Sequence, residues 1–400
     1  MATPLRLPDA QARLLALVKP LPVERVDVPS ALGRYLAEPL VAQRTQPAAR
    51  VSAMDGYAVR ADDLAGPWRV VGESAAGHPY TGTVAPREAV RISTGALLPA
   101  ATDAVIVQED TAREDGTITL TGSGPEPAGR HIRREGTDFN CHDALLPAGT
   151  RLGPAQLALA IAGGHRHIPV RRMPRLAVIE CGDELAADPE SCPAHQIPAS
   201  NGVMIAALAA GLPVETRRIG PVADSVPALI AALGTAGDAD VIVTTAGASV
   251  GDHDLVRPAL EQWGATLDFW RVAIKPGKPL LIATRGSQLV VGLPGNPVSA
   301  FVTAHLFLLP LLRALLGAAQ PLPRAVALKL GAALPATGDR QEFVRGHLAP
   351  EGVLPVSSQD SGALCALAAT DLLIDRPAGS PALPARSEVP AYLLQNGGPA

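Results

Sequence analysis

The chain has 400 residues, of which 47% are hydrophobic and 18% are charged, and its formal net charge is −4. This length can hold two to four domains of roughly 100–200 residues each. The acidic balance and an aromatic content of only 3% argue against a nucleic-acid-binding protein, which needs a basic surface and aromatic stacking platforms.

Cysteine usage and the apolar segments indicate where the protein works. The four cysteines show no CxxC spacing, which favours a reduced, cytoplasmic protein. The N-terminal segment contains no continuous apolar stretch, so we expect no signal peptide. The most membrane-like segment, residues 301–319, contains His305, Pro310 and Arg313. These residues favour a core helix over a membrane span.

Helical signals lie on either side of a β-rich stretch. Apolar spacing predicts a short helix over 8–19, and Ser30 is a candidate N-cap for a second helix over 31–38. A third helix is predicted with Pro154 at its start and Gly163 at its end. We expect this helix to pack on the first two, so that all three form one small helical domain.

The rest of the chain divides by the pattern of its strands. Short β-rich runs separated by glycine and proline predict an inserted β-domain. Strands then alternate with helices, which implies a parallel sheet covered on both faces. The predicted fold class is α/β plus β in several domains: a small helical domain in two parts (1–42 and 142–173), an inserted β-domain (43–141), a central parallel-sheet α/β domain (174–318) and a C-terminal β-barrel-like domain (319–400).

Unusual residues follow several strands of the α/β domain. Ligands bind outside the carboxyl ends of strands in open α/β sheets, so four such loops at one edge predict a polar pocket. An ordinary strand-to-helix turn is the alternative for each loop taken alone. The loops are Gly182-Asp183-Glu184, Asp224, Gly247 to Asp254, and Pro294 to Pro297.

Two of these loops suit an anion. The small residues Gly247, Ser249 and Gly251 would let backbone N–H groups approach a ligand closely. Asn296 can cap the next helix and Pro297 suits its first position, which brings a second helix N-terminus to the same edge.

A stiff basic loop follows at RVAIKPGKPL (271–280). Arg271 and Lys275 are four residues apart, so both point to one face of an extended chain, and Lys278 adds a third cation. This loop suits a phosphate or another oxyanion, and a solvated charged turn is the alternative.

The neighbouring acids complicate a simple anion site. They would repel an anion unless a cation lay between, and hard oxygen ligands beside phosphate suggest Mg²⁺. Helix capping or a surface charge is the alternative for each acid. A zinc site at His165 and His167 is disfavoured because no cysteine or acid stands at ligand spacing. The acids are Asp183, Glu184, Asp224, Asp252 and Asp254.

Within the β-domain, polar residues stand in three turns: Asp55 in SAMDGYAV, Thr94 in RISTGALLP and Asp138 in HIRREGTDF. Taken alone, these residues favour ordinary turns with polar tips. The sequence shows no Ser-His-Asp arrangement, nucleophile elbow or P-loop, so neither a covalent catalyst nor an ordinary NTPase is predicted.

Together these segments resemble one family, the molybdopterin molybdenumtransferases, bacterial relatives of the C-terminal domain of gephyrin. The resemblance spans about Ser52 to Phe301 in the family's order, and QDSGAL (359–364) is similar to the family's C-terminal domain. The segments are SAMDGYAV, RISTGALLP, DAVIVQED, HIRREGTDF, GDEL, SNGV, TTAGASVGDHD, FWRVAIKPGKP and GLPGNPVSAF.

The resemblance implies insertion of molybdate into adenylylated molybdopterin with release of AMP, in the presence of Mg²⁺. It implies four domains and a homodimer with a shared active cleft, and we expect contact with the molybdopterin adenylyltransferase but no nucleic acid or membrane. The implied catalytic positions are Asp55, Thr94, Asp138, Glu184, Asp224, Asp254, Arg271 and Lys275. The expected metal ligands are Glu184, Asp224 and Asp254, and the expected cofactor-binding residues are Gly247, Ser249, Gly251, Lys278, Pro294, Gly295, Asn296 and Pro297.

The chain departs from the family pattern in three places. Glu180-Cys181 replace Ser-Thr, Ala246 and Ala248 replace a glycine and a valine of the family's glycine-rich loop, and Arg271 replaces a lysine. These departures keep two rivals open. One is a non-catalytic molybdopterin-binding or scaffold protein, and the other is a molybdopterin adenylyltransferase, which would need no flanking β-domains.

Overall fold

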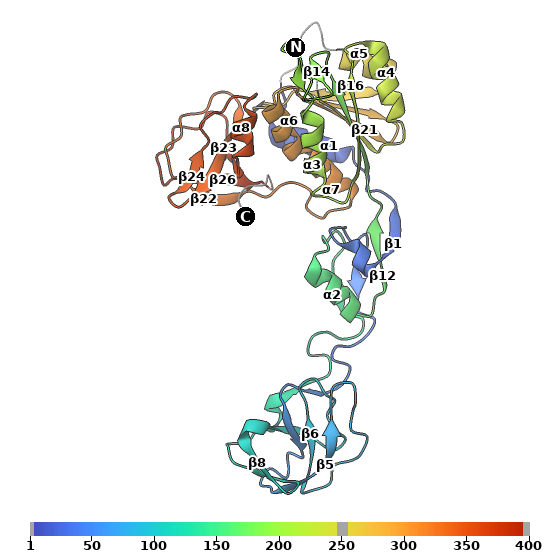
Figure 1. The fold of residues 1–400 in the computed structure, drawn as a ribbon, viewed down its shortest axis with the longest axis vertical. Helices are drawn as coiled ribbons and strands as arrows, with labels where there is room; N and C mark the ends of the chain where they lie inside the picture. The colour runs from blue at the N-terminus through green and yellow to red at the C-terminus, as the bar shows by residue number, and fades with distance from the viewer. Residues whose placement is uncertain (1–3, 246–254, 395–400) are drawn as a thin grey trace.

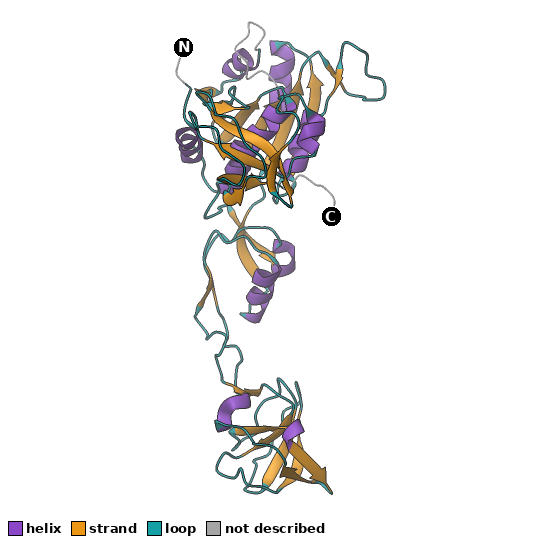
Figure 2. Ribbon diagram, turned by 90° about the vertical axis from the view of Figure 1, so that its left-hand side faces the viewer, coloured by secondary structure: helices purple, strands orange, loops and turns teal. Residues whose placement is uncertain are grey.

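The structure of the protein, a computed structural model, describes residues 4–245 and 255–394. The molecule is elongated (Figures 1 and 2): the α/β unit and the C-terminal unit lie side by side at one end, and the inserted β-domain lies at the other. A narrow middle unit joins them.

A mixed six-stranded sheet forms the centre of the α/β unit, with the order β16-β13-β17-β21-β20-β18. The prediction of a parallel sheet is correct for the first four strands and wrong for β20 and β18, which pair antiparallel. Only two residues separate Arg285 from Gln288, and so short a connection can join antiparallel strands alone. The strands are β13 (Arg175–Cys181), β16 (Glu215–Val222), β17 (Val241–Thr245), β18 (Thr266–Trp270), β20 (Leu281–Arg285) and β21 (Gln288–Leu293).

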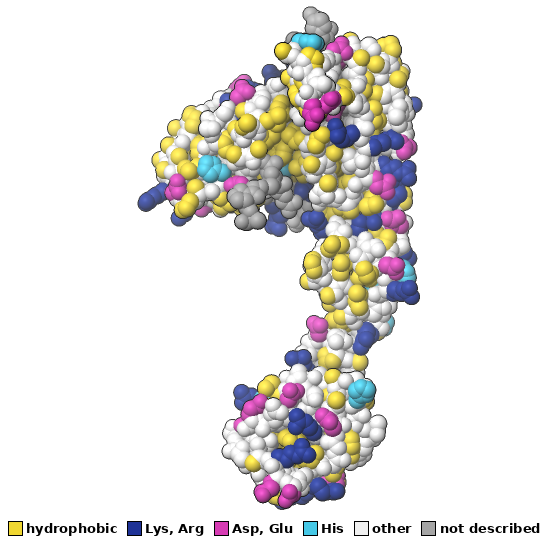
Figure 3. All heavy atoms as spheres, in the orientation of Figure 1, with side chains coloured by type: hydrophobic (Ala, Val, Ile, Leu, Met, Phe, Trp, Pro, Cys, Tyr) yellow, Lys and Arg dark blue, Asp and Glu magenta, His cyan; other side chains and the backbone are white. Residues whose placement is uncertain are grey.

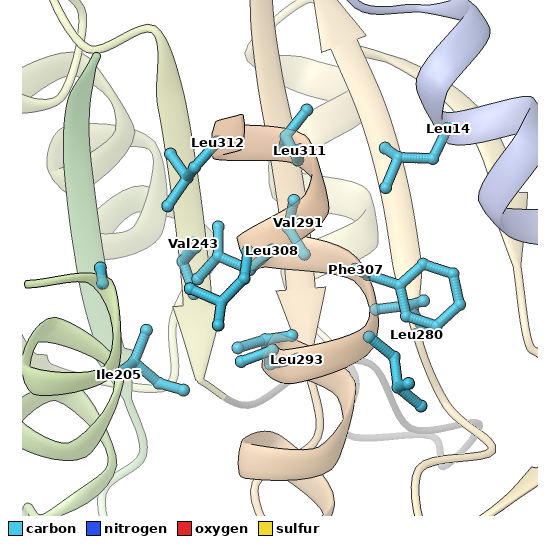
Figure 4. Packing of buried hydrophobic residues seen from close by; sticks show 14 of the residues in the cluster. Leu14, Ile205, Val243, Leu280, Val291, Leu293, Phe307, Leu308, Leu311 and Leu312 are labelled. Carbon is cyan, nitrogen blue, oxygen red and sulfur yellow. The ribbon is translucent and has the colours of Figure 1, made fainter. Parts of the chain in front are cut away.

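Helices cover both faces of this sheet because its apolar side chains alternate between two cores. Leu176 and Val178 of β13 face one core, and Ala177 and Ile179 face the other. Figure 4 shows the first core, where the helices pack on the sheet. Its helices are α1 (Leu7–Ala16), α3 (Asn201–Ala209), α6 (Pro297–Thr303), the π-helical turn η4 (Ala304–Leu308) and α7 (Leu309–Leu315), and the opposite face carries α4 (Val226–Thr235) and α5 (Val256–Gln262).

The continuous helix formed by α6, η4 and α7 is the one segment of the described chain that is long and apolar enough to cross a membrane. However, 89% of its apolar window is buried inside the protein. It therefore packs as the core helix that the sequence predicts.

The N-terminal helix does not belong where the sequence analysis put it. Leu14 of α1 lies in the core of the α/β unit, and the side chain of Gln11 donates to the carbonyl of Leu306 at 2.9 Å. Amphipathic spacing indicates that a helix has a buried face, but it cannot say which surface covers that face.

The predicted helix over 31–38 does not form. The chain makes only a 3-10 turn, η1 (Val28–Ala31), after which Gly33 has a φ of +76°. This left-handed conformation ends the helical path, and Leu36 then bridges to Val170 in extended conformation.

The middle unit consequently contains more strand than helix. It has a single α-helix, α2, which begins at Pro154 and ends before Gly163 as predicted. The predicted domain limits stay a prediction. The elements of the unit are β1 (Val23–Asp27) paired with β12 (His167–Arg171), β2 (Leu40–Val41) paired with β11 (Ala144–Leu146), and α2 (Pro154–Ala162).

The inserted β-domain folds around Trp68, which is fully buried among Tyr57, Ile106 and Ile118. Its main sheet has the order β7-β4-β6-β5-β9-β8. The strands are β3 (Val51–Ser52), β4 (Gly56–Val59), β5 (Trp68–Ser74), β6 (Glu88–Ile92), β7 (Ala104–Val107), β8 (Thr111–Glu114), β9 (Thr117–Leu120) and β10 (Ile132–Arg133), with short 3-10 turns η2 (Gln108–Asp110) and η3 (Ala128–His131).

The C-terminal unit is a sheet that nearly closes on itself. Leu330, next to β22, bridges to Val353 of β24, which supports the expected barrel-like form. A strand from the α/β segment, β19 (Ile274–Lys275), adds to this sheet beside β23. The other elements are β22 (Val326–Lys329), β23 (Gln341–Ala349), β24 (Gly352–Pro355), α8 (Leu364–Ala368), β25 (Leu372–Arg376) and β26 (Glu388–Leu393).

Candidate active site

A cavity of about 820 Å³ lies at the carboxyl ends of β13, β17 and β21. Figure 3 shows hydrophobic side chains gathered where the α/β unit meets the C-terminal unit, and Leu185, Ile197 and Leu364 are among the residues of the cavity wall. The hydroxyl of Thr245 is buried in this wall and has no hydrogen-bond partner among the described residues. Five of the predicted residues also line the cavity: Glu184, Pro294, Gly295, Asn296 and Pro297.

A second cavity of about 370 Å³ adjoins the first, since Pro279 and Ser299 line both. Three cations stand around it: Lys275 and Lys278 from the α/β segment and Arg340 from the C-terminal unit. Hence the basic loop is not surrounded by solvent on all sides. It forms one wall of a small cavity between two units.

Pairing of β19 with β23 holds the basic loop in place. Lys275 stands opposite Glu342 in this register, and its ammonium contacts the Glu342 carboxylate at 3.2 Å. The guanidinium of Arg340 also donates to the carbonyl of Ile274 at 3.4 Å. Gly277 has a φ of +102°, and a Cβ there would lie 2.5 Å from the Thr303 side chain, so the loop needs glycine to pack this closely.

Arg271 does not join the other cations. It is absent from the walls of both cavities, and its φ of +88° interrupts the extended chain on which the prediction of a shared face with Lys275 rests. That geometric argument is therefore wrong. Its backbone N–H donates to Leu280 at 3.0 Å and its carbonyl accepts from Leu5 at 3.2 Å.

The turn before α6 differs from expectation in one respect. Pro297 takes the first helical position as predicted, but the Asn296 side chain makes no capping bond. Instead, its amide donates to the Ser361 hydroxyl at 3.0 Å, and the Val298 N–H donates to the Ser361 carbonyl at 3.1 Å. This turn therefore ties the α/β unit to the loop 357–363 of the C-terminal unit.

Two of the acids at the sheet edge, Asp183 and Asp224, hold each other in place. Asp183 and Asp224 bind each other's backbone, with carboxylate-to-nitrogen distances of 3.1 and 3.4 Å. No cluster of three or more candidate metal ligands occurs within residues 4–245 and 255–394. Outside the described residues lie Ala246, Gly247, Ala248, Ser249, Gly251, Asp252 and Asp254.

The thiol of Cys181 is no candidate nucleophile. Burial, reinforced by the nearby carboxylates of Asp224, Glu180 and Glu184, raises its pKa to about 12. The thiol therefore stays protonated at neutral pH, and a protonated thiol is a poor nucleophile.

A separate group forms in the inserted β-domain. The Thr94 N–H donates to the Asp55 carboxylate at 2.6 Å, and this bond lowers the pKa of Asp55. Asp138 and Gly95, next to Thr94, line a cavity of about 600 Å³ together with two arginines, Arg44 and Arg133. In a single chain this group lies in a different body from the two cavities between the α/β and C-terminal units (Figure 1).

Comparisons with known proteins cover nearly the whole chain. Family profiles match residues 5–164 as MoeA N-terminal region (domain I and II), 177–314 as a probable molybdopterin binding domain and 327–394 as MoeA C-terminal region (domain IV). The chain is 36% identical over 321 residues to the molybdopterin molybdenumtransferase of Haemophilus influenzae, with 79% of each chain covered. It is 34% identical over 373 residues to the Nostoc protein of that name, with 89% of this chain and 85% of the relative covered.

This chain belongs to the molybdopterin molybdenumtransferase family. Its fold matches that of a molybdopterin biosynthesis MoeA protein from Pyrococcus horikoshii, with 29% identity, a TM-score of 0.81 and coverage of 98% and 99% of the two chains. A second structure of such a protein gives 26% identity, a TM-score of 0.83 and coverage of 98% and 100%. The matched flanking regions disfavour the rival adenylyltransferase.

Several residues of the cavity walls were not predicted from the sequence. Ser299 and Ser361 lie inside the quoted segments GLPGNPVSAF and QDSGAL, so a signal existed. The scarcity of lysine also marked this loop, because only four lysines occur in the sequence and the predicted residues Lys275 and Lys278 are two of them. Arg340 and Glu342 carried no local signal, since only the pairing of β19 with β23 brings them to the site.

Proposed function

We propose that the protein inserts molybdate into adenylylated molybdopterin, releases AMP and thereby forms molybdenum cofactor. The observation that carries this proposal is the junction of the two cavities, which share Pro279 and Ser299. One cavity offers cations for a compact oxyanion, and the other offers room for a pterin joined to a nucleotide. The reaction needs these two ligands side by side.

The smaller cavity suits molybdate. Lys275, Lys278 and Arg340 supply positive charge, and the Ser299 and Ser361 side chains stand in the same wall. Lysine carries a compact charge with three rotatable donors, whereas the planar fork of arginine matches flat anions. The two lysines therefore suit a tetrahedral oxyanion. The rest of the chain carries its positive charge mainly on arginine, so two lysines in one wall are unusual for it. Fixed cations of this kind also stabilise charge that develops during the reaction.

The larger cavity suits the pterin nucleotide. Its wall combines apolar side chains such as Leu185 and Leu364 with hydrogen-bonding groups, among them the unpartnered Thr245 hydroxyl and the Asn201 side chain. Mostly apolar walls with a few polar groups are typical of cofactor sites. The turn at Pro294 to Pro297, with Gly247 to Gly251 beyond the described residues, would hold the phosphate end.

Magnesium would accompany the phosphates. Glu184 lines the larger cavity, and Asp224 stands on the neighbouring loop, bound to Asp183. Carboxylate oxygens are suitable Mg²⁺ ligands, and this ion uses only one or two carboxylates beside water and phosphate. Glu184 and Asp224, joined by Asp254, would therefore hold the ion, which would offset the charge of the pyrophosphate.

The inserted β-domain would serve a partner chain. Asp55, Thr94 and Asp138 gather in a body remote from their own chain's cavities (Figures 1 and 2). A homodimer with a shared cleft would bring this group to the partner's cavities. The protein would act in the cytoplasm and receive its substrate from the molybdopterin adenylyltransferase.

The deciding experiment incubates the protein with adenylylated molybdopterin, molybdate and Mg²⁺ and follows AMP release. We expect AMP release that depends on molybdate, together with formation of molybdenum cofactor. Tight binding of the substrate without AMP release would overturn the proposal in favour of a scaffold role.

A further inference from the structure

The carboxylate of Glu180 is buried in the wall of the larger cavity. Glu180 stands near the end of β13, lines the cavity and is only 2% exposed. A buried charge is costly unless it is paired and hydrogen-bonded. Both needs are met here: Oε1 accepts from the Gly202 N–H at 2.7 Å, and Oε2 contacts the Arg218 guanidinium at 3.2 Å.

This contact anchors the first turn of α3. The first N–H groups of a helix have no partner within the helix, and a negative charge there also interacts favourably with the helix dipole. Ser200, the residue before α3, makes no capping bond with its side chain. A Cβ on Gly202 would lie 2.2 Å from Oε2 of Glu180, so a glycine at this position is what lets the carboxylate approach.

A chain of contacts leads from this anchor to the rest of the wall. Asn201, the neighbour of Gly202, donates its side-chain amide to the Gly295 carbonyl at 2.6 Å. The next residue, Asn296, donates to Ser361 of the C-terminal unit. Three residues of this series of contacts line the larger cavity: Asn201, Gly295 and Asn296.

We propose that Glu180 is a positioning residue for the pterin-nucleotide substrate. It holds the start of α3, and through Asn201 the turn at Gly295, in the shape that the substrate requires. Its charge also occupies the N-terminal end of α3, so the phosphates of the substrate are directed toward the turn at Pro294 to Pro297 instead. The inference rests on the proposed function, because it takes adenylylated molybdopterin as the ligand of this cavity.

The test compares Glu180→Ala, Glu180→Gln and a control, Glu215→Gln, in the AMP-release assay. The control removes an equal charge from the start of β16, where Glu215 faces Arg175 at 3.7 Å. We expect Glu180→Ala to raise KM for adenylylated molybdopterin about tenfold, while kcat and KM for molybdate change less than about twofold. Glu180→Gln keeps an oxygen for the Gly202 N–H, so it should recover most of this loss, and the control should match wild type.

A second measurement needs no turnover. Hydrogen–deuterium exchange of the full-length protein should be faster in Glu180→Ala at residues 201–205 and 294–298, and unchanged in the Glu215→Gln control. If the wild-type protein releases no AMP, the proposed function fails while the exchange result still decides the anchor. Unchanged exchange and unchanged KM in Glu180→Ala would overturn the inference, and so would a loss of kcat with no increase in KM for adenylylated molybdopterin. If Glu180→Ala does not fold, Glu180→Gln carries the test, with a smaller KM increase expected.

Discussion

The cavities between the α/β and C-terminal units and the cavity of the inserted β-domain both collect residues that the sequence singles out, but they are built differently. The first pair is cut into packed structure, where Lys275 is held by a strand pairing and Asn296 by a second unit. The β-domain cavity is walled by exposed residues such as Asp138 and by two arginines. We infer that the former forms the binding pocket and that the latter supplies groups to a pocket on another chain.

The largest effect should come from Lys275→Ala. Loss of the ammonium beside Glu342 removes charge stabilisation from the smaller cavity, so kcat/KM for AMP release should fall at least ~100-fold. Because the side chain is 55% exposed, the melting temperature should stay close to that of wild type. Lys329→Ala, on a surface strand of the C-terminal unit, is the matched control. Normal cofactor formation by Lys275→Ala would remove the basis for calling this pocket the active one.

A mixing experiment tests the other half of the comparison. Lys275→Ala and Asp55→Ala should each be inactive, but co-purified heterodimers should regain activity, because one of their two clefts contains neither substitution. If the subunits form closed twofold dimers, a pure heterodimer should have about half of wild-type activity, and a randomly paired mixture about a quarter. No recovery in proven heterodimers would mean that the β-domain serves its own chain or none.

A smaller effect is expected at the junction between Asn296 and Ser361, which lie 3.0 Å apart. Asn296→Ala and Ser361→Ala should each raise KM for one of the two substrates roughly two- to tenfold, the range that corresponds to one hydrogen bond. Their double variant should be little worse than either single one, since both remove the same bond. Fully additive losses would show that the two residues act separately.

The last prediction concerns stability instead of activity, at a histidine in each region. Burial in the core helix lowers the pKa of His305 to about 4, below the ordinary value of about 6.5. The unfolded chain therefore binds the proton more readily, so stability should decrease as pH falls from about 6.5 to 4, by on the order of 3 kcal/mol at this site. His305→Leu should flatten this dependence in thermal melts, whereas His78→Gln, on the surface of the β-domain, should leave it unchanged. An equal slope in both variants would contradict the assignment to His305.

Periodicity predicted the parts of the fold where burial is uniform. The apolar runs of β13 and β17 are buried along nearly their whole length, and such runs are typical of a parallel sheet. Local turns were harder to predict. The left-handed conformation of Gly33 prevents the helix predicted over 31–38. The short connection after Arg285 makes β20 antiparallel to β21, where a parallel strand was predicted.

The candidate site divides along the same line. Lys275 and the turn at Asn296 could be predicted because loops at strand ends have a known place in α/β sheets. Arg340 could not, because its approach to Lys275 depends on a pairing between strands about 65 residues apart in sequence. Nor could the anchoring of α3 by Glu180, because no local pattern links residue 180 to residue 202.

The strand β19 has a mechanical consequence. Ile274 and Lys275 follow the α/β strands in sequence, yet their backbone pairs with Gln341 and Glu342 of the C-terminal unit. Any hinge motion of the C-terminal unit must therefore move the Lys275 ammonium with it or break that pairing. A chain truncated after α7 would leave Lys275 without the backbone pairing that holds it in place.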